Sequence, residues 1–352
     1  MRTVLLVDMD YFYVACEELR HPEIKGVPAV VGMDPKGGSG RGVVMTCNYE
    51  ARKFGIRSGM PISMAYRIKP DAIYLPLDYD YYDIISAKVM AAIKPLAGKF
   101  EQVSVDEAYM DVSAKIAHAS EALEYARTVQ KRVLDDVGIK CSIGIGPNKL
   151  IAKMACESAK PAGIKQVKEE EVGEFLKDME VGKLYGIGEK TAQKLRKLGY
   201  STVGQLSKAN MMRMMELFGA FGAEMVRNAK GIDDSAVVEN YGIKSIGREF
   251  TFDSDTDSGV EIEARIGELG RGVSLEVSKS KKSFKTITLK LRYADFTEHL
   301  HSKSIKVTDS PEMLISTAVN LYRQNADRSR KIRKIGVRVS NLVDYSGQKK
   351  II

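Results

Sequence analysis

Hydrophobic residues recur at different spacings along this chain, and each spacing predicts a type of secondary structure. Residues 3–8 form a short apolar run that predicts a buried strand at the start of the chain. Further short runs predict a hairpin that includes Ser104 and Tyr109, and then a strand at 140–145. Apolar residues at helical spacing predict the helices 11–19, 81–96, 120–137 and 147–159. This order is typical of an α+β domain with an antiparallel sheet and helices on one face.

A smaller α/β segment interrupts this domain between residues 20 and 78. It contains a strand at 29–31, a glycine-rich loop at 34–40, a strand at 42–46 and a helix that begins at Asn48. Asp10, which precedes the helix 11–19, has the short acceptor side chain that N-cap positions prefer. We therefore interpret Asp10 as a helix cap rather than as a metal ligand.

Residues 169–231 carry only helical patterns. Two amphipathic segments, 172–179 and 189–198, flank the sequence Leu184-Tyr185-Gly186-Ile187-Gly188-Glu189-Lys190. Glycines between two helices let the backbone approach a phosphate, and the N–H groups that open the following helix point at the anion. The pattern predicts a helix-hairpin-helix, with a weaker copy at 217–222. Its candidate contacts to a phosphate backbone are Gly186, Gly188 and Lys190.

A polar stretch at 232–244 has no helical period and predicts a linker to a last domain at 245–345. Within that domain, residues alternate in character along 287–293, 304–308 and 334–340, which predicts strands with one apolar and one basic or hydroxyl face. Helices are predicted at 259–278 and 311–325, the second with Ser310 as its N-cap. A basic sheet face suits a sugar-phosphate backbone. The candidate contacts are Arg248, Lys290, Arg292, Lys306, Lys334 and Arg338.

Composition narrows the class of protein further. Apolar residues make up 44% and charged residues 28% of the 352 positions, as in globular proteins, and no apolar run is long enough to span a membrane. Because the chain enters a strand at once, no secretory signal is expected. The four cysteines are widely spaced, which favours reduced thiols and a cytoplasmic location. Residues 245–352 hold 20 Lys and Arg against 14 Asp and Glu, which is most of the net charge of +8.

Carboxylates end two of the predicted strands. Asp8 ends the first strand, and Asp106 and Glu107 lie in the hairpin about a hundred residues later. Brought together, these three residues would offer the hard oxygen ligands that Mg²⁺ prefers, with positions left for substrate phosphates. The sequence therefore predicts a site for two-metal phosphoryl transfer.

Four motifs in this order resemble the Y-family translesion DNA polymerases, of the DNA polymerase IV type found in bacteria and archaea. They are Asp8-Met9-Asp10-Tyr11-Phe12-Tyr13, Asn48-Tyr49-Glu50-Ala51-Arg52-Lys53-Phe54-Gly55, Ser104-Val105-Asp106-Glu107-Ala108-Tyr109 and Ala159-Lys160-Pro161. The resemblance covers essentially the whole chain. It implies an α+β palm (1–19 and 79–168), small α/β fingers (20–78), an all-helical thumb (169–231), a linker (232–244), a four-stranded α+β little finger (245–345) and a tail (346–352).

The resemblance also implies roles for individual residues. Asp8, Asp106, Glu107 and the main-chain carbonyl of Met9 match the ligands of two Mg²⁺ ions. Tyr49, Arg52 and Lys160 match contacts to the triphosphate of a dNTP. Tyr13 matches a steric gate against the 2′-hydroxyl, although by spacing alone it could equally be a core aromatic.

Further expectations concern the substrates and partners. Val43 and Met45 match the roof over the nascent base pair, where a bulky roof favours abasic or minor-groove lesions over thymine dimers. The resemblance implies synthesis on a primer-template with low fidelity and low processivity, by a monomer. In the tail, Gln348 and Ile351 look like the first half of a sliding-clamp peptide.

Two other functions remain open from the residues alone. A non-catalytic DNA-binding scaffold would use the basic last domain and the helix-hairpin-helix, with the carboxylates as relics. A palm-type nucleotidyl cyclase would use the carboxylates but would not need the helix-hairpin-helix, the basic sheet or Tyr13.

Overall fold

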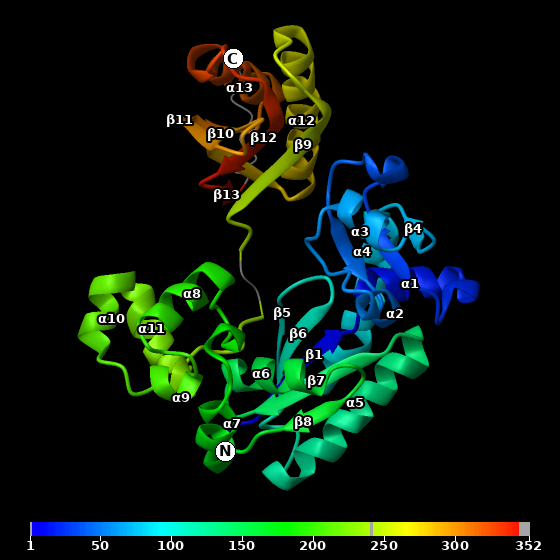
Figure 1. The fold of residues 1–352 in the computed structure, drawn as a ribbon, viewed down its shortest axis with the longest axis vertical. Coiled ribbons are helices and arrows are strands. Elements are labelled where there is room, and N and C mark those ends of the chain that lie inside the picture. Colours follow the sequence, from blue (N-terminus) through cyan, green and yellow to red (C-terminus); the bar gives the residue numbers. More distant parts are fainter. Residues whose placement is uncertain (1, 240–241, 345–352) are drawn as a thin grey trace. The chain divides into compact units, whose positions relative to one another are not determined.

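A computed structural model describes residues 2–239 and 242–344 of the chain (Figure 1). The described residues of 1–38 and 43–240 form one compact unit, and those of 39–42 and 241–352 form a second. The tail that carries Gln348 and Ile351 lies outside the described residues. None of the described helices is both long and apolar enough to cross a membrane.

The first unit is built on a five-stranded sheet of order β5-β6-β1-β7-β8. Its first four strands pair antiparallel, as expected, whereas β8 pairs parallel with β7. The strands are β1 (Val4–Met9), β5 (Lys99–Gln102), β6 (Glu107–Asp111), β7 (Cys141–Gly146) and β8 (Ile164–Gln166).

Helices cover both faces of this sheet, so the expectation of helices on one face is wrong. Leu5 and Val7 point into a core shared with one group of helices, α1 (Phe12–Arg20), α4 (Tyr79–Ile93) and α5 (Ala122–Val137). On the other face, Val4 and Leu6 pack against α6 (Lys149–Ala159). The close approach of α6 depends on Gly144 of β7, because a Cβ there would lie 2.0 Å from the carbonyl oxygen of Ala152.

A second, three-stranded sheet lies in the segment between α1 and α4, with the order β3-β2-β4. Asn48 caps α2 by accepting a hydrogen bond from the Ala51 N–H, as the sequence predicts for a helix that begins there. The elements are β2 (Ala29–Gly32), β3 (Val44–Cys47), β4 (Ile73–Leu75), α2 (Tyr49–Lys53) and α3 (Ile62–Ile68).

Residues 169–239 of the first unit contain helices but no described strand. The predicted helix 172–179 is shortened to Val172–Lys177. A single 3₁₀ turn at Val181–Lys183 then leads into the hairpin before α8. The α-helices are α7 (Val172–Lys177), α8 (Glu189–Lys197), α9 (Val203–Leu206), α10 (Met211–Phe218) and α11 (Ala220–Ala229). The other 3₁₀ helices of the chain are Pro22–Ile24, Lys36–Gly38, Lys94–Leu96, Ala119–Glu121 and Glu169–Glu171.

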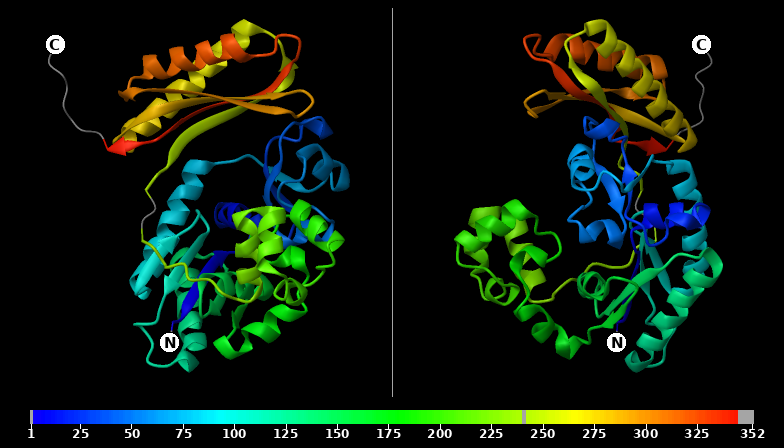
Figure 2. Two further views of the ribbon diagram at one scale, coloured as in Figure 1. Left: turned by 90° about the vertical axis from the view of Figure 1, so that its left-hand side faces the viewer. Right: turned by 45° about the vertical axis from the view of Figure 1, so that its right-hand side comes forward.

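The second unit is a four-stranded antiparallel sheet of order β11-β10-β12-β9, with two helices on one face (Figure 2). The predicted alternation is confirmed along 287–293, where Ile287, Leu289 and Leu291 are fully buried, but it is wrong along 304–308 of the edge strand β11, where Val307 is 51% exposed. The edge strand β9 was not identified from periodicity, because only two of its twelve residues are buried. The elements are β9 (Ser245–Thr256), β10 (Lys282–Tyr293), β11 (Glu298–Thr308), β12 (Ile332–Ser340), the short β13 (Val343–Asp344), α12 (Gly259–Lys279) and α13 (Pro311–Asn325).

Candidate functional site

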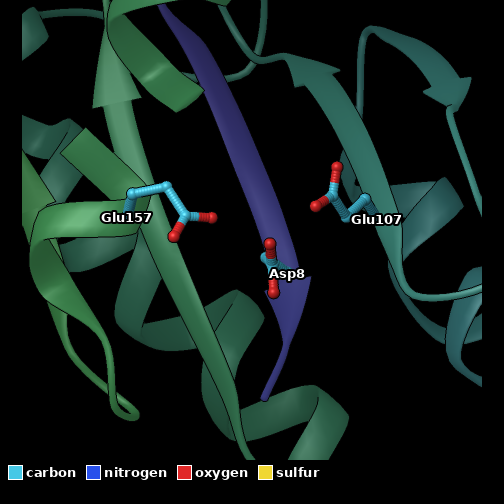
Figure 3. Close-up of side chains that lie close together, drawn as sticks. All are labelled: Asp8, Glu107 and Glu157. Carbon is cyan, nitrogen blue, oxygen red and sulfur yellow. The ribbon is translucent and has the colours of Figure 1, made fainter. Parts of the chain in front are cut away.

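Asp8 and Glu107 are direct neighbours across the pair of β1 and β6. Side chains alternate along a strand, so Asp8 follows Leu6 onto the face that α6 covers, and Glu107 lies on the same face. Glu157 of α6 completes a group of three carboxylates that each offer an oxygen within 4.8 Å of the others. Figure 3 shows these side chains converging from β1, β6 and α6.

Asp106 lies in the tight hairpin between β5 and β6, next to this group but not within it. Its main-chain carbonyl accepts a hydrogen bond from the N–H of Met9 at 2.9 Å, which joins the hairpin to the end of β1. The Ser104 hydroxyl donates to the Asp106 carboxylate at 2.6 Å, so Ser104 forms a local hydrogen bond within the turn. The side chain of Met9 is buried in the core.

Two ammonium groups lie among these carboxylates. Lys153 pairs with Glu107 and lies 3.4 Å from both Asp8 and Glu157. Lys160 lies 2.9 Å from Asp8 and 2.8 Å from Glu157. The site therefore gathers three carboxylates and two cations in a half-buried space. Hard oxygen ligands at this spacing fit a divalent metal ion.

Burial and charge shift the titration of these groups in opposite directions. Burial raises the pKa of Asp8 to about 6, the hydrogen bond with Glu107 adds to the shift, and the Lys160 ammonium opposes it. Burial disfavours the charged form of Lys153, but Asp8 and Glu107 together raise its pKa above the ordinary value. The two lysines thus remain cationic and offset the cost of burying Asp8.

Asp10 does not cap a helix, which corrects the prediction from sequence. The N-cap of α1 is Tyr11, which makes no side-chain capping bond. The Asp10 carboxylate accepts instead from three partners: the Ala162 N–H at 2.7 Å, the Ser142 hydroxyl at 3.0 Å and the Tyr49 hydroxyl at 3.1 Å. Burial raises the pKa of Asp10, and these three hydrogen bonds oppose the shift.

Among the candidate nucleotide contacts, Tyr49 binds Asp10 directly. The Tyr49 ring stacks under the Arg52 guanidinium, with 4.8 Å from Cζ to the ring centroid. Tyr13 is half-buried, and its ring lies 4.7 Å from that of Tyr82. Just before β3, Val43 is 40% exposed and pairs with Pro61 in an isolated bridge, while Met45 is half-buried in β3.

In the helix-hairpin-helix, the two glycines have different geometries. Gly186 adopts a φ of +88°, which an L-side chain rarely takes, and Gly188 is the N-cap of α8. Lys190 is exposed in the first turn of α8.

Most of the predicted basic contacts of the second unit share one face of its sheet. Lys290 and Arg292 on β10 lie opposite Gly336 and Lys334 on β12, and Arg338 lies one pair further along, opposite Thr288. Arg248 pairs with Val337 in the register and forms a salt bridge of 2.9 Å with Glu276 of α12, so it lies on the helix-covered face. Lys306 is exposed on the edge strand β11.

Sequence reasoning missed four charged residues that matter here. Lys153 and Glu157 occur on α6 at positions i and i+4, a common surface pattern that gave no signal of a site. Glu249 and Glu298 occur close to basic residues in β9 and β11, and no sequence pattern distinguishes them from other surface acids.

Three family profiles match the chain. The impB/mucB/samB family matches residues 7–157, the HHH motif of the IMS family matches residues 169–200, and the C-terminal domain of the impB/mucB/samB family matches residues 243–351. The chain is 41% identical over 352 residues to DNA polymerase IV 2 of Methanosarcina mazei, across 100% of this chain and 95% of the relative. It is 34% identical over 337 residues to DNA polymerase IV of Streptococcus pneumoniae serotype 2, across 96% of each.

Solved structures of DNA polymerases are also similar to this chain. A Y-family DNA polymerase chimera superposes with a TM-score of 0.90 at 30% identity, covering 97% of this chain and 99% of that chain. DinB from Sulfolobus solfataricus has a TM-score of 0.66 at 30% identity with the same coverage.

Proposed function

This chain belongs to the impB/mucB/samB family and is a Y-family, DNA-directed DNA polymerase, and we propose that it extends a primer 3′-hydroxyl with dNTPs on damaged as well as intact templates. The observation that carries the proposal is the pairing of Asp8 with Glu107 across two strands, beside the hairpin that holds Asp106. Carboxylates in this arrangement suit two-metal phosphoryl transfer.

The family uses divalent metals, and the donor set of this chain suits them. Asp8, Asp106 and Glu107 would hold two Mg²⁺ ions, with the main-chain carbonyl of Met9 as a further ligand. When bound, these ions supply the positive charge that activates a 3′-hydroxyl and stabilises a departing pyrophosphate.

Other residues of the chain would bind and orient the dNTP. Lys160 would act as a point charge toward the triphosphate, which offers it a stronger partner than Asp8. Arg52 would grip a phosphate through two donors while its stacking on Tyr49 fixes its direction. Tyr13, supported from behind by Tyr82, would lie against the sugar.

The remaining residues would hold the primer-template. The hairpin Gly186–Gly188 with Lys190 would contact the duplex backbone through main-chain N–H groups and one cation. The polar face of the second unit, with Lys290, Lys334 and Arg338, would contact sugar-phosphate groups without reading their sequence. We further propose that the protein acts as a monomer and that its tail, through Gln348 and Ile351, contacts a sliding clamp.

Primer extension tests the catalytic assignment. Asp106→Asn keeps the size of the side chain but removes its charge, so we expect extension with Mg²⁺ to fall by about a hundredfold to a thousandfold, the scale of losing a main electrostatic contact in a transition state. DNA binding should remain within about twofold of wild type, because metal ligands are not the main source of affinity for the phosphate backbone.

Asp135→Asn is the matched control, because among residues 2–239 and 242–344 Asp135 makes only an exposed pair with Lys131 within α5. It should extend primers like the wild type. If Asp106→Asn also extended primers at the wild-type rate, the assignment of the metal site would be wrong. If the wild type bound DNA but did not extend it, a non-catalytic scaffold would replace the polymerase.

A further inference from the structure

Two acidic residues occupy the basic face of the second unit. On this face, the strand register sets Glu298 opposite Arg292, and Glu249 opposite Gly336, whose other neighbour is Lys290. A groove of about 530 Å³ crosses the same face and is lined by Glu249, Lys290, Glu298 and Arg338, among others. The candidate phosphate contacts therefore lie among carboxylates.

These two carboxylates form ion pairs with three of the four candidate phosphate contacts on this face. Lys290 lies between them, 3.0 Å from Glu249 and 3.1 Å from Glu298. Arg292 donates to Glu298 from Nε at 2.8 Å and from Nη2 at 2.5 Å, and Lys334 pairs with Glu249. Arg338, by contrast, has no carboxylate within ion-pairing distance in the described part of the chain. Three of four cations on this face thus already have an anionic partner.

The backbone is shaped to hold one of the two acids in place. Gly336 leaves an open position on the sheet, where a Cβ would lie 2.9 Å from Cγ of Glu249 and 3.4 Å from Cβ of Lys290. The Glu249 side chain therefore lies over Gly336 and reaches both Lys290 on β10 and Lys334 on β12. Burial works to raise the pKa of Glu249, but Lys334 and Lys290 outweigh it and hold the pKa below its usual range, so the carboxylate stays charged.

We propose that Glu249 and Glu298 limit the affinity of this polymerase for nucleic acid, by pairing with Lys290, Arg292 and Lys334 and so competing with backbone phosphates for them. This inference rests on the proposed function, in which the basic face contacts sugar-phosphate groups. A phosphate that approaches the face must displace a carboxylate and then remain beside its negative charge. Because partly exposed ion pairs contribute little net stability, a phosphate can displace the carboxylate, but the exchange reduces the gain in affinity from each contact.

The test replaces each acid by its neutral isostere. We expect Glu249→Gln and Glu298→Gln each to tighten binding of a primer-template by on the order of fivefold at moderate salt, the scale of one exposed ion pair. The slope of log Kd against log salt should steepen by about 1 for each cation that gains a phosphate. Fluorescence anisotropy with a labelled duplex over a series of KCl concentrations measures both quantities without any need for catalysis.

The double variant gives a sharper signature. Lys290 keeps one carboxylate partner in either single variant and loses both only in the double variant. The gain in affinity of the double variant should therefore exceed the product of the two single gains, as expected for residues that share a partner. We also expect it to add more nucleotides in each binding event.

Glu263→Gln is the matched control. Glu263 is 29% exposed, like Glu298, and pairs with Arg323 between α12 and α13, away from the polar face. Glu263→Gln changes the net charge by the same amount as the sheet variants. Because Glu263 does not pair with a candidate phosphate contact, its replacement should leave the affinity and the salt slope unchanged. An equal gain in Glu263→Gln, unchanged binding in the sheet variants, or weaker binding in them would each overturn the inference. If the wild type failed to bind primer-template, the proposed function itself would fail.

Discussion

At the scale of single residues, the proposed catalytic site balances buried charges of opposite sign. Asp8 is only 3% exposed, and a carboxylate at that depth is costly unless a cation accompanies it. Lys153 and Lys160 provide this positive charge, 3.4 Å and 2.9 Å from Asp8. A divalent ion would also neutralise the Asp8 carboxylate. Both lysines therefore belong to the proposed site, although only Lys160 was predicted, from its motif.

Tyr13 gives the prediction that belongs to this scale. Tyr13→Ala should raise the efficiency of ribonucleotide incorporation relative to deoxyribonucleotide incorporation on the order of tenfold, which corresponds to about 1.4 kcal/mol of lost discrimination. The reason is that only the ring would block a 2′-hydroxyl. Steady-state kinetics with single nucleotides measures the ratio.

Tyr13→Phe is the control, because it keeps the ring and its packing against Tyr82 and removes only the hydroxyl. It should retain the discrimination of the wild type. An unchanged ratio in Tyr13→Ala, in a protein that still folds and extends primers, would exclude the gate.

At the scale of elements, Asp10 ties several segments together. Its carboxylate binds Ser142 of β7, the main chain of Ala162 after α6, and Tyr49 of α2. The main chain of Ala162 holds the loop after Lys160 in place. The Ala162 N–H donates to the Asp10 carboxylate, and the Ala162 carbonyl accepts a hydrogen bond from the Gln130 side chain at 3.1 Å. One side chain thus couples the palm sheet to the residues expected to bind the triphosphate.

Asp10→Asn should weaken both stability and nucleotide binding. The amide has one acceptor oxygen in place of two, and its N–H₂ group would face a hydrogen-bond donor that is now unpaired. We expect the free energy of unfolding to fall by about 1–3 kcal/mol and the KM for dNTP to rise. Chemical denaturation and steady-state kinetics measure the two effects.

Asp111→Asn serves for comparison. Asp111 is half-buried at the end of β6 opposite to Glu107, and its carboxylate accepts a hydrogen bond from the N–H of Ser113. Asp111→Asn should leave the KM unchanged. The coupling role would be disproved by an Asp10→Asn protein with wild-type KM.

At the scale of the whole molecule, the two units have separate cores and differ in thiol content. All four cysteines are free, fully buried and located in the first unit. Their widely spaced positions predicted reduced thiols, and the structure confirms that none is paired. Burial raises the pKa of every one of them, to about 12 for Cys16 from an ordinary value of 9.0.

Thiol labelling should therefore report the unfolding of the first unit alone. The native protein should resist alkylation at pH 8, because thiols that are protonated and inaccessible do not react, and four groups should react in denaturant. Unfolded thiols ionise near pH 9 while native ones do not, so the free energy of unfolding should fall as the pH rises above about 9.

Cys141→Ala should lower the number of reactive groups in denaturant from four to three, and it checks the assignment. Rapid labelling of the folded protein at pH 8 would contradict the burial of these residues.

The sequence by itself determined the features that depend on neighbours along the chain. The burial of Ile287, Leu289 and Leu291 followed from alternation, and Asn48 and Ser310 cap the helices that they precede. The four ordered motifs, including those around Asp8 and Asp106, identified the family, because the residues of each motif are contiguous.

Only the tertiary structure decided which distant residues share a site. The approach of α6 over Gly144 brings Lys153 and Glu157 to Asp8. Asp10 met partners from three other segments rather than a helix end, and the register of four strands placed Glu249 and Glu298 among the cations. The physical reason is that an ionic side chain takes the nearest partner in space, and that partner is set by strand register and helix packing, which short sequence patterns do not contain.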